Sequence, residues 1–157
     1  DGPVAIILTR QDVLIIDQEK YTKATALEKG AYILSDCEGE PQLILMGTGS
    51  EVQLLLEAQQ KLLQESIRVR VVSFPCWELF DKQTADYKEK VLPGHIRKRL
   101  AVEAGSPIGW SKYVTDDGDV IGVTQFGESA PGDELMNVYG FSTKNITAKA
   151  KALLQNK

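Results

Sequence analysis

Short apolar runs separated by helical periods dominate the chain from Ala31 onward. Five runs have the length and composition of buried strands: Tyr32–Leu34, Leu43–Met46, Val69–Phe74, Leu100–Val102 and Val120–Val123. Segments with helical spacing or turn residues fill the gaps between them. This alternation predicts an α/β protein built in layers. The connection from the first run to the second is shorter than the dozen residues that a parallel crossover needs, so we expect these two runs to pair antiparallel.

The helices follow from the apolar stripes between the runs. A helix is expected from about residue 50 to 65, with Ser50 and Gln53 as a capping-box pair. Another is expected after Ser142, a predicted N-cap, with an apolar stripe that ends the chain. Shorter helical turns are predicted in three less regular segments, namely 75–92, 107–114 and 133–139.

The first thirty residues have a different pattern. Val4–Leu8 is a continuous apolar run of the kind that forms a strand buried on both faces, yet no other run lies close to it in sequence. Residues 11–30 are polar and mixed. We therefore expect residues 1–10 to be the last strand of an upstream domain, 11–30 to be a linker, and 31–157 to be the domain itself. On this interpretation the chain is a piece of a longer polypeptide.

Composition narrows the classes of function. With 18 basic and 22 acidic residues the formal charge is −4, so no positive field is available to attract nucleic acid. No apolar run approaches the roughly 20 residues that span a bilayer, so no membrane partner is expected. The two cysteines form no Cys-x-x-Cys and the chain has a single His, which excludes a Cys/His zinc site.

A turn between a strand and a helix is the first candidate site. Gly47, Thr48, Gly49 and Ser50 precede the helix expected at 50–65. Free amides and the helix dipole at such a place can hold an anion. The turn matches neither the dinucleotide nor the P-loop fingerprint, and a plain tight turn, the favoured interpretation, has the same composition.

Two carboxylates follow neighbouring predicted strands. Glu103 comes directly after Leu100–Val102, and Glu128 follows Val120–Val123. Open α/β sheets bind ligands at the carboxyl ends of their strands, so the pair is a candidate acid and base. Hydrogen-bonded carboxylates that fix neighbouring loops are an equal alternative.

Arg10 has the clearest physical argument. It follows Leu8-Thr9 at the end of the predicted upstream strand, which delivers its guanidinium to the rim of that domain. A guanidinium stays charged and matches phosphate or carboxylate in two-point contact. An interdomain salt bridge is the equal alternative.

Four segments, in this order, carry a resemblance to a known family: Leu8-Thr9-Arg10-Gln11, Gly47-Thr48-Gly49-Ser50-Glu51-Val52, Ala101-Val102-Glu103-Ala104-Gly105 and Phe126-Gly-Glu-Ser-Ala-Pro. Together the four resemble the C-terminal region of transketolase over nearly the whole chain. The resemblance implies a three-layer α/β/α domain with a mixed five-stranded sheet, its first strand antiparallel to the rest.

The resemblance also implies a function for a longer parent protein. Transketolases are homodimers that transfer a two-carbon ketol unit between sugar phosphates of the pentose phosphate or Calvin pathway, using thiamine diphosphate and Mg or Ca. Their C-terminal domain binds neither cofactor, so no catalytic, cofactor or metal residue is expected in this chain. Arg10 falls on the family's arginine that grips the substrate phosphate. The isolated chain is expected to be inactive and to serve dimer contacts, structure and phosphate binding.

Two alternatives remain for the function. One is a nucleotide- or anion-binding regulatory module that uses the Gly47 to Ser50 turn. The other is the C-terminal domain of a related thiamine-diphosphate enzyme, such as dihydroxyacetone synthase or deoxyxylulose-phosphate synthase. A cytoplasmic location is expected, or a plastid if a transit peptide lies upstream of Asp1.

Overall fold

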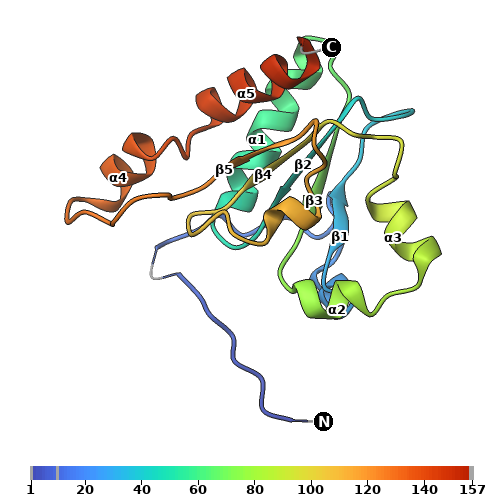
Figure 1. Cartoon of the computed structure of the whole chain (residues 1–157), viewed down its shortest axis with the longest axis horizontal. Coiled ribbons are helices and arrows are strands. Elements are labelled where there is room, and N and C mark those ends of the chain that lie inside the picture. The colour runs from blue at the N-terminus through green and yellow to red at the C-terminus, as the bar shows by residue number, and fades with distance from the viewer. Residues whose placement is uncertain (1, 10, 156–157) are drawn as a thin grey trace.

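The computed structural model of the chain describes residues 2–9 and 11–155. Its described residues form a five-stranded sheet in the order β1-β3-β2-β4-β5, shown in Figure 1. The strands are β1 (Tyr32–Ser35), β2 (Leu43–Gly47), β3 (Val69–Ser73), β4 (Arg99–Val102) and β5 (Asp119–Ile121). Four of them are parallel, and β1 alone runs antiparallel. The mixed five-stranded sheet predicted from the sequence is therefore confirmed.

The partner of β1 differs from the expected one. β1 pairs with β3, with Tyr32 opposite Ser73, and not with β2. Both edges of β2 are already occupied, since β3 and β4 pair with it in parallel. β1 instead occupies the outer edge of β3. The short connection correctly predicts that β1 and β2 run in opposite directions, but the two strands are not neighbours in the sheet.

One face of the sheet is covered by α1 (Glu51–Gln64) and α5 (Thr143–Gln155), which lie side by side in Figure 1. Their inward residues pack on the apolar side chains of the strands because both helices carry apolar residues at helical spacing. The buried side chains of the two helices in this core are Val52, Leu55, Leu56, Ala58, Leu62, Ile146, Ala150 and Leu153.

The other face is covered by α2 (Trp77–Asp81), α3 (Ala85–Val91) and the 3₁₀ turn η2 (Trp110–Lys112). This second core is aromatic. Phe74 makes edge-on contacts with Phe80, Trp110 and Tyr113, with ring centroids 4.5–5.5 Å apart. Helical elements on both faces of one sheet confirm the predicted three-layer α/β/α architecture.

The predicted helix caps fare differently. Ser142 accepts a hydrogen bond from the amide of Asn145 at 3.3 Å and caps α5 as expected. The capping box at α1 is wrong, because Ser50 makes no capping hydrogen bond and Gln53 instead accepts from the amide of Leu14 at 3.1 Å. The short helical segments expected in 75–92, 107–114 and 133–139 are all present. They are α2 and α3, the 3₁₀ turn η2, and α4 (Gly132–Val138).

The N-terminal residues lie apart from the two cores. Residues 2–9 belong to no strand and extend away from the sheet in Figure 1, with the side chains of Val4–Leu8 exposed. After residue 11 the chain returns to the body, where Ile16 and Tyr21 pack against the α1 core and η1 (Ala24–Lys29) precedes β1. The assignment of residues 1–10 to an upstream domain stays a prediction. Within the described residues, no helix combines the length and apolarity needed to cross a bilayer.

Candidate functional site at the carboxyl edge of the sheet

The turn from β2 into α1 packs too tightly for any side chain at Gly47. A Cβ there would lie 2.9 Å from the Leu55 side chain and 3.0 Å from the carbonyl oxygen of Val102. Gly49 adopts a φ of 57°, in the left-handed region that favours glycine. These two glycines let α1 begin directly beside the carboxyl end of β4, where the next residues of interest lie.

Glu51, the first residue of α1, points its carboxylate into this turn. The side chain is only 4% exposed. One carboxylate oxygen accepts a hydrogen bond from the amide of Ala104 at 2.8 Å, and the other accepts from the hydroxyl of Ser50 at 3.2 Å. Glu51 therefore joins the start of α1 to the loop that follows β4. A carboxylate at a helix N-terminus is also favoured by the helix dipole.

The same carboxylate weighs against an anion at the turn. Gly47, Thr48, Gly49 and Ser50 all lie beside it, and a second negative group would meet a buried charge. The amides of Glu51 and Val52 are also directed to the carbonyls of Thr48 and Gly49, at 3.3 and 3.4 Å. The anion site stays a prediction, and Glu51 is the physical argument against it.

Glu103 lies at the end of β4 and is half-buried. Burial raises the pKa of its carboxyl group, and the nearby charge of Glu51 raises it further, while a hydrogen bond from the indole of Trp110 opposes the shift. The distance from the indole nitrogen to the Glu103 oxygen is 3.4 Å. Trp110 itself is fully buried. Glu103 is thus held between the aromatic core and a like-charged neighbour.

The expected partnership of Glu103 with Glu128 does not form. Glu128 lies in an exposed segment after β5 and has no hydrogen-bond or ion-pair partner among the described residues. The carboxylate that acts on Glu103 is Glu51, which the sequence analysis did not single out as a site residue. The available signal was its position, since an acidic residue directly after a glycine turn stands at the first turn of a helix.

The arrangement ties the start of α1 to the loop that follows β4. Its carboxylates accept hydrogen bonds from the amide, the hydroxyl and the indole already named. Across residues 2–9 and 11–155, no three His, Cys, Asp or Glu side chains come together to hold a metal.

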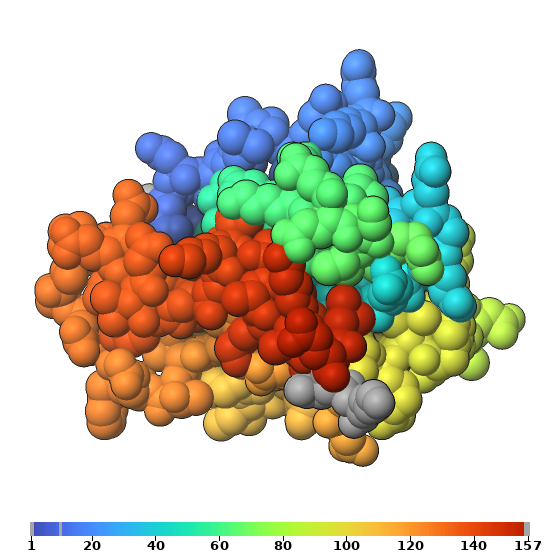
Figure 2. All heavy atoms as spheres, turned by 90° about the horizontal axis from the view of Figure 1, so that it is seen from above, coloured from blue at the N-terminus to red at the C-terminus, as the bar shows by residue number. Residues whose placement is uncertain are grey.

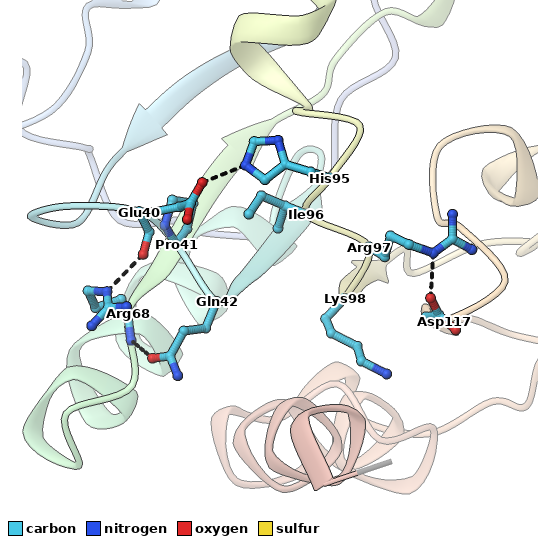
Figure 3. A pocket seen from close by; sticks show the side chains of 9 residues that line it. All are labelled: Glu40, Pro41, Gln42, Arg68, His95, Ile96, Arg97, Lys98 and Asp117. Carbon is cyan, nitrogen blue, oxygen red and sulfur yellow. Dashed lines mark hydrogen bonds and ion pairs between the residues drawn. The ribbon is translucent and has the colours of Figure 1, made fainter. Parts of the chain in front are cut away.

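The opposite edge of the sheet carries an open hollow of about 550 Å³ (Figure 3). Basic side chains line it, but carboxylates lie among them. Figure 3 shows His95 against Glu40 and Arg97 against Asp117, and the Nε of Arg68 donates to the carbonyl of Glu40 at 2.8 Å. The hollow lies at the amino ends of the strands. Acidic and basic side chains both line it, and this mixture favours no particular ligand.

Arg99, the first residue of β4, is a charged residue in a buried position. Within the part of the chain that the structure describes, its buried guanidinium donates to main-chain carbonyl oxygens, those of Ile96, Tyr113, Leu92 and Pro93. Burial lowers the pKa of this guanidinium. Arg99 therefore joins β4 to the segments around it as a structural residue.

Arg10, the predicted phosphate-binding residue, lies outside the described residues. On its C-terminal side, the amide of Gln11 donates to the hydroxyl of Thr9 at 3.2 Å. The structure therefore leaves the role of Arg10 as a prediction.

Comparison with known proteins gives a consistent result. The profile of the family described as "Transketolase-like TK C-terminal domain" matches residues 30–142. The transketolase of Aquifex aeolicus is 50% identical over 149 residues, which are 95% of this chain and 22% of that protein. The transketolase of Halalkalibacterium halodurans is 43% identical over 157 residues, all of this chain and 24% of that protein. The chain thus spans about a quarter or less of these relatives.

Solved structures agree with this result. Transketolase from Leishmania mexicana is 36% identical, with a TM-score of 0.77 over 83% of this chain and 19% of that one. Transketolase from Pichia stipitis in complex with sedoheptulose 7-phosphate is 32% identical, with a TM-score of 0.78 over 86% of this chain and 19% of that one. Because the profile covers most of the sheet, and because both sequence and fold match, the chain belongs to the transketolase C-terminal domain family.

Proposed function

We propose that this chain is the C-terminal part of a longer transketolase, which transfers a two-carbon ketol unit between sugar phosphates. The supporting observation is sequence identity of 43–50% to transketolases over 95–100% of the chain. The complex of the related Pichia stipitis enzyme with sedoheptulose 7-phosphate supports a sugar phosphate as the substrate class. As part of this proposal the parent is a cytoplasmic homodimer, and the bacterial relatives offer no support for a plastid.

Within this proposal, Arg10 binds the phosphate of the sugar substrate. It directly follows Thr9, at the end of the predicted strand that leads out of the upstream domain. A guanidinium offers two parallel N–H donors that match two phosphate oxygens and stays charged at every physiological pH. The residue would position the substrate without taking part in the chemistry of ketol transfer.

Thiamine diphosphate and a divalent metal are implied by the family for the parent. The described residues do not fit either group. No cluster of His, Cys, Asp or Glu among them could hold a metal, and Glu51 places a carboxylate at the glycine turn where a diphosphate would need free amides. The remaining three quarters of the parent would have to supply the cofactor sites.

The test of Arg10 compares two kinds of substrate in the full-length parent. Arg10→Ala should raise KM for phosphorylated sugars far more than for unphosphorylated ones. Loss of one charge-assisted contact costs on the order of 2–5 kcal/mol, or roughly 30-fold to several thousand-fold in kcat/KM. Arg10→Lys keeps the charge and loses the two-point contact, so it should fall between the two. Equal losses for both kinds of substrate would contradict the phosphate role.

The isolated chain should show no ketol transfer, because it contains no complete cofactor site in this proposal. Turnover by the purified chain would contradict that division of labour. The regulatory-module alternative is not favoured, given the matches to transketolases and the buried carboxylate at its supposed anion site. A related thiamine-diphosphate enzyme is likewise not favoured, because the relatives reported above are named transketolase.

A further inference from the structure

Residues 122–131, which we call the exit loop, connect β5 to α4 and are built unlike the rest of the domain. Residues 124–131 are exposed without interruption. Phe126, the largest apolar side chain among them, is 96% exposed. Apart from the bonds at the start of α4, which the amides of Glu134 and Leu135 donate to the carbonyl of Pro131, two hydrogen bonds hold the described loop. They run from the amide of Val123 to the carbonyl of Gly105 at 2.8 Å and from the hydroxyl of Tyr139 to the carbonyl of Phe126 at 3.3 Å. Contacts with the rest of the domain therefore stabilise this loop only weakly.

Neither steric crowding nor backbone conformation requires a glycine at Gly127 in the exit loop. A Cβ on Gly127 would meet nothing within 4 Å, and its φ is not in the left-handed region. By contrast, Gly30 and Gly109 would place a Cβ 2.3 Å from other atoms of the body. Glycine that its own fold does not require suits a place where something outside the chain approaches the backbone closely.

The N-terminal segment leaves the body beside this loop. The position of a Cβ on Gly132, directly after the exit loop, lies 3.6 Å from the side-chain amide of Gln11. The amide of Leu14 is fixed to α1 through Gln53, so the chain is anchored at this place. Figure 2 shows the blue atoms of the N-terminal segment bordering the orange atoms of residues in the region of α4.

Chain length then limits where the apolar run Val4–Leu8 can lie. Leu8 precedes Gln11 by three residues, and an extended chain spans at most about 3.6 Å per residue, roughly 11 Å in all. Whatever domain contains Val4–Leu8 as a strand must therefore stand within about that distance of Gln11 and the exit loop. Val4–Leu8 is exposed in the described structure, although apolar runs of this kind are normally buried within a sheet.

We propose that the exit loop, with Phe126 as its apolar anchor, is the surface on which the preceding domain of the same polypeptide docks. The inference rests on the proposed function for the existence of that domain. The tether through residue 11 selects the domain of the same subunit as occupant, because it holds that domain beside the loop at a high effective concentration. Docking there fixes the end of the strand that leads to Arg10 relative to the C-terminal domain.

Hydrogen exchange of a peptide covering residues 122–131 tests this proposal in the full-length protein. The loop amides should exchange at least about 10-fold more slowly in the full-length protein than in the isolated chain, as expected for a region that binding closes. Phe126→Asp in the full-length protein should return exchange to within about 2-fold of the isolated chain. Leu63→Asp, a matched change of an exposed apolar residue toward the far end of α1, should leave the protection intact.

The possible results separate the two proposals. Unprotected loop amides in a full-length protein that is active in ketol transfer would overturn the docking proposal and leave the proposed function standing. Protection in a full-length protein without ketol transfer would support docking and count against the proposed function. If Phe126→Asp instead produces monomers by sedimentation while the loop stays protected within each monomer, Phe126 contacts a second copy, and the docking role is wrong.

Discussion

Phe74 and Phe126 are the same type of residue, but one is buried and the other is exposed. Phe74, at the end of β3, is 1% exposed and contacts three other rings, whereas Phe126, in the exit loop, is 96% exposed and contacts none. Around Phe74 the packed body, residues 31–121 and 141–155, closes two cores over one sheet. Around Phe126 the loop has few bonds to its own domain. The comparison separates the buried core, which stabilises the domain, from the exposed exit loop, which is free to contact a neighbouring domain.

The largest predicted effect is on the stability of the isolated chain. Phe74→Ala should lower the free energy of unfolding by about 3–5 kcal/mol, because it leaves a cavity within the aromatic core. Phe126→Ala should change it by less than about 0.5 kcal/mol, since nothing packs on that ring. Urea unfolding of the two variants measures both values. Similar losses would show that Phe126 packs within the domain after all.

A pair of glycines gives the next largest effect. Gly30 and Gly39 both have positive φ, of 80° and 75°. A Cβ on Gly30 would lie 2.3 Å from the backbone nitrogen of Phe80, whereas one on Gly39 meets open space. Gly39→Ala should therefore cost only the strain of the left-handed conformation, about 1–2 kcal/mol.

Gly30→Ala should cost about 1–3 kcal/mol more than Gly39→Ala, because backbone atoms of the body have to move. Thermal unfolding of the isolated chain compares the two. Equal costs would mean that the contact between the linker end and α2 is looser than the structure indicates.

The smallest effect is a pH dependence at the carboxyl edge. The folded pKa of Glu103 is raised, chiefly by burial, so its contribution to stability is fully present below the ordinary carboxyl pKa of 4.5 and is lost as pH rises through the raised value. Glu103→Gln, which can still accept the indole hydrogen bond, should thus be more stable than the unchanged chain at pH 7. The advantage should disappear below about pH 4.5.

Glu128→Gln is the matched control for this pH dependence, since that carboxylate is exposed and has no partner among the described residues. It should leave the free energy of unfolding within about 0.5 kcal/mol at both pH values. Denaturant unfolding at pH 4 and pH 7 makes the comparison. An advantage of Glu103→Gln that is the same at both pH values would indicate repacking and not removal of a disfavoured charge.

The features that sequence predicts here are those set by neighbours along the chain. The apolar runs at Leu43–Met46 and Val69–Phe74 identify central strands because both of their faces are buried. Ser142 identifies the start of α5 because a cap acts only three residues away. Strand direction and helical period depend on neighbours along the chain, so a single sequence contains them. Capping was predicted correctly at Ser142 but wrongly at Ser50, because Gln53 bonds the distant Leu14.

The features that sequence missed depend on distant segments. The partner of β1 depends on which strand edge stays free, and this follows only once β4 has paired with β2. Glu51 resembles any acidic residue in a first helical turn, and only the fold shows that the amide of Ala104, 53 residues later, donates a hydrogen bond to its carboxylate. In the sequence, Phe126 is one more apolar residue, and only the folded structure shows that the domain leaves it uncovered.

The central claim, that the exit loop is open in this domain and covered in the longer protein, has a direct test in limited cleavage by chymotrypsin. The enzyme cuts after exposed aromatic residues in chain that can open locally, and Phe126 meets both conditions in the isolated chain. We predict cleavage after Phe126 at least about 10-fold slower in the full-length protein than in the isolated chain. Equal rates of cleavage after Phe126 in the two proteins would contradict the account.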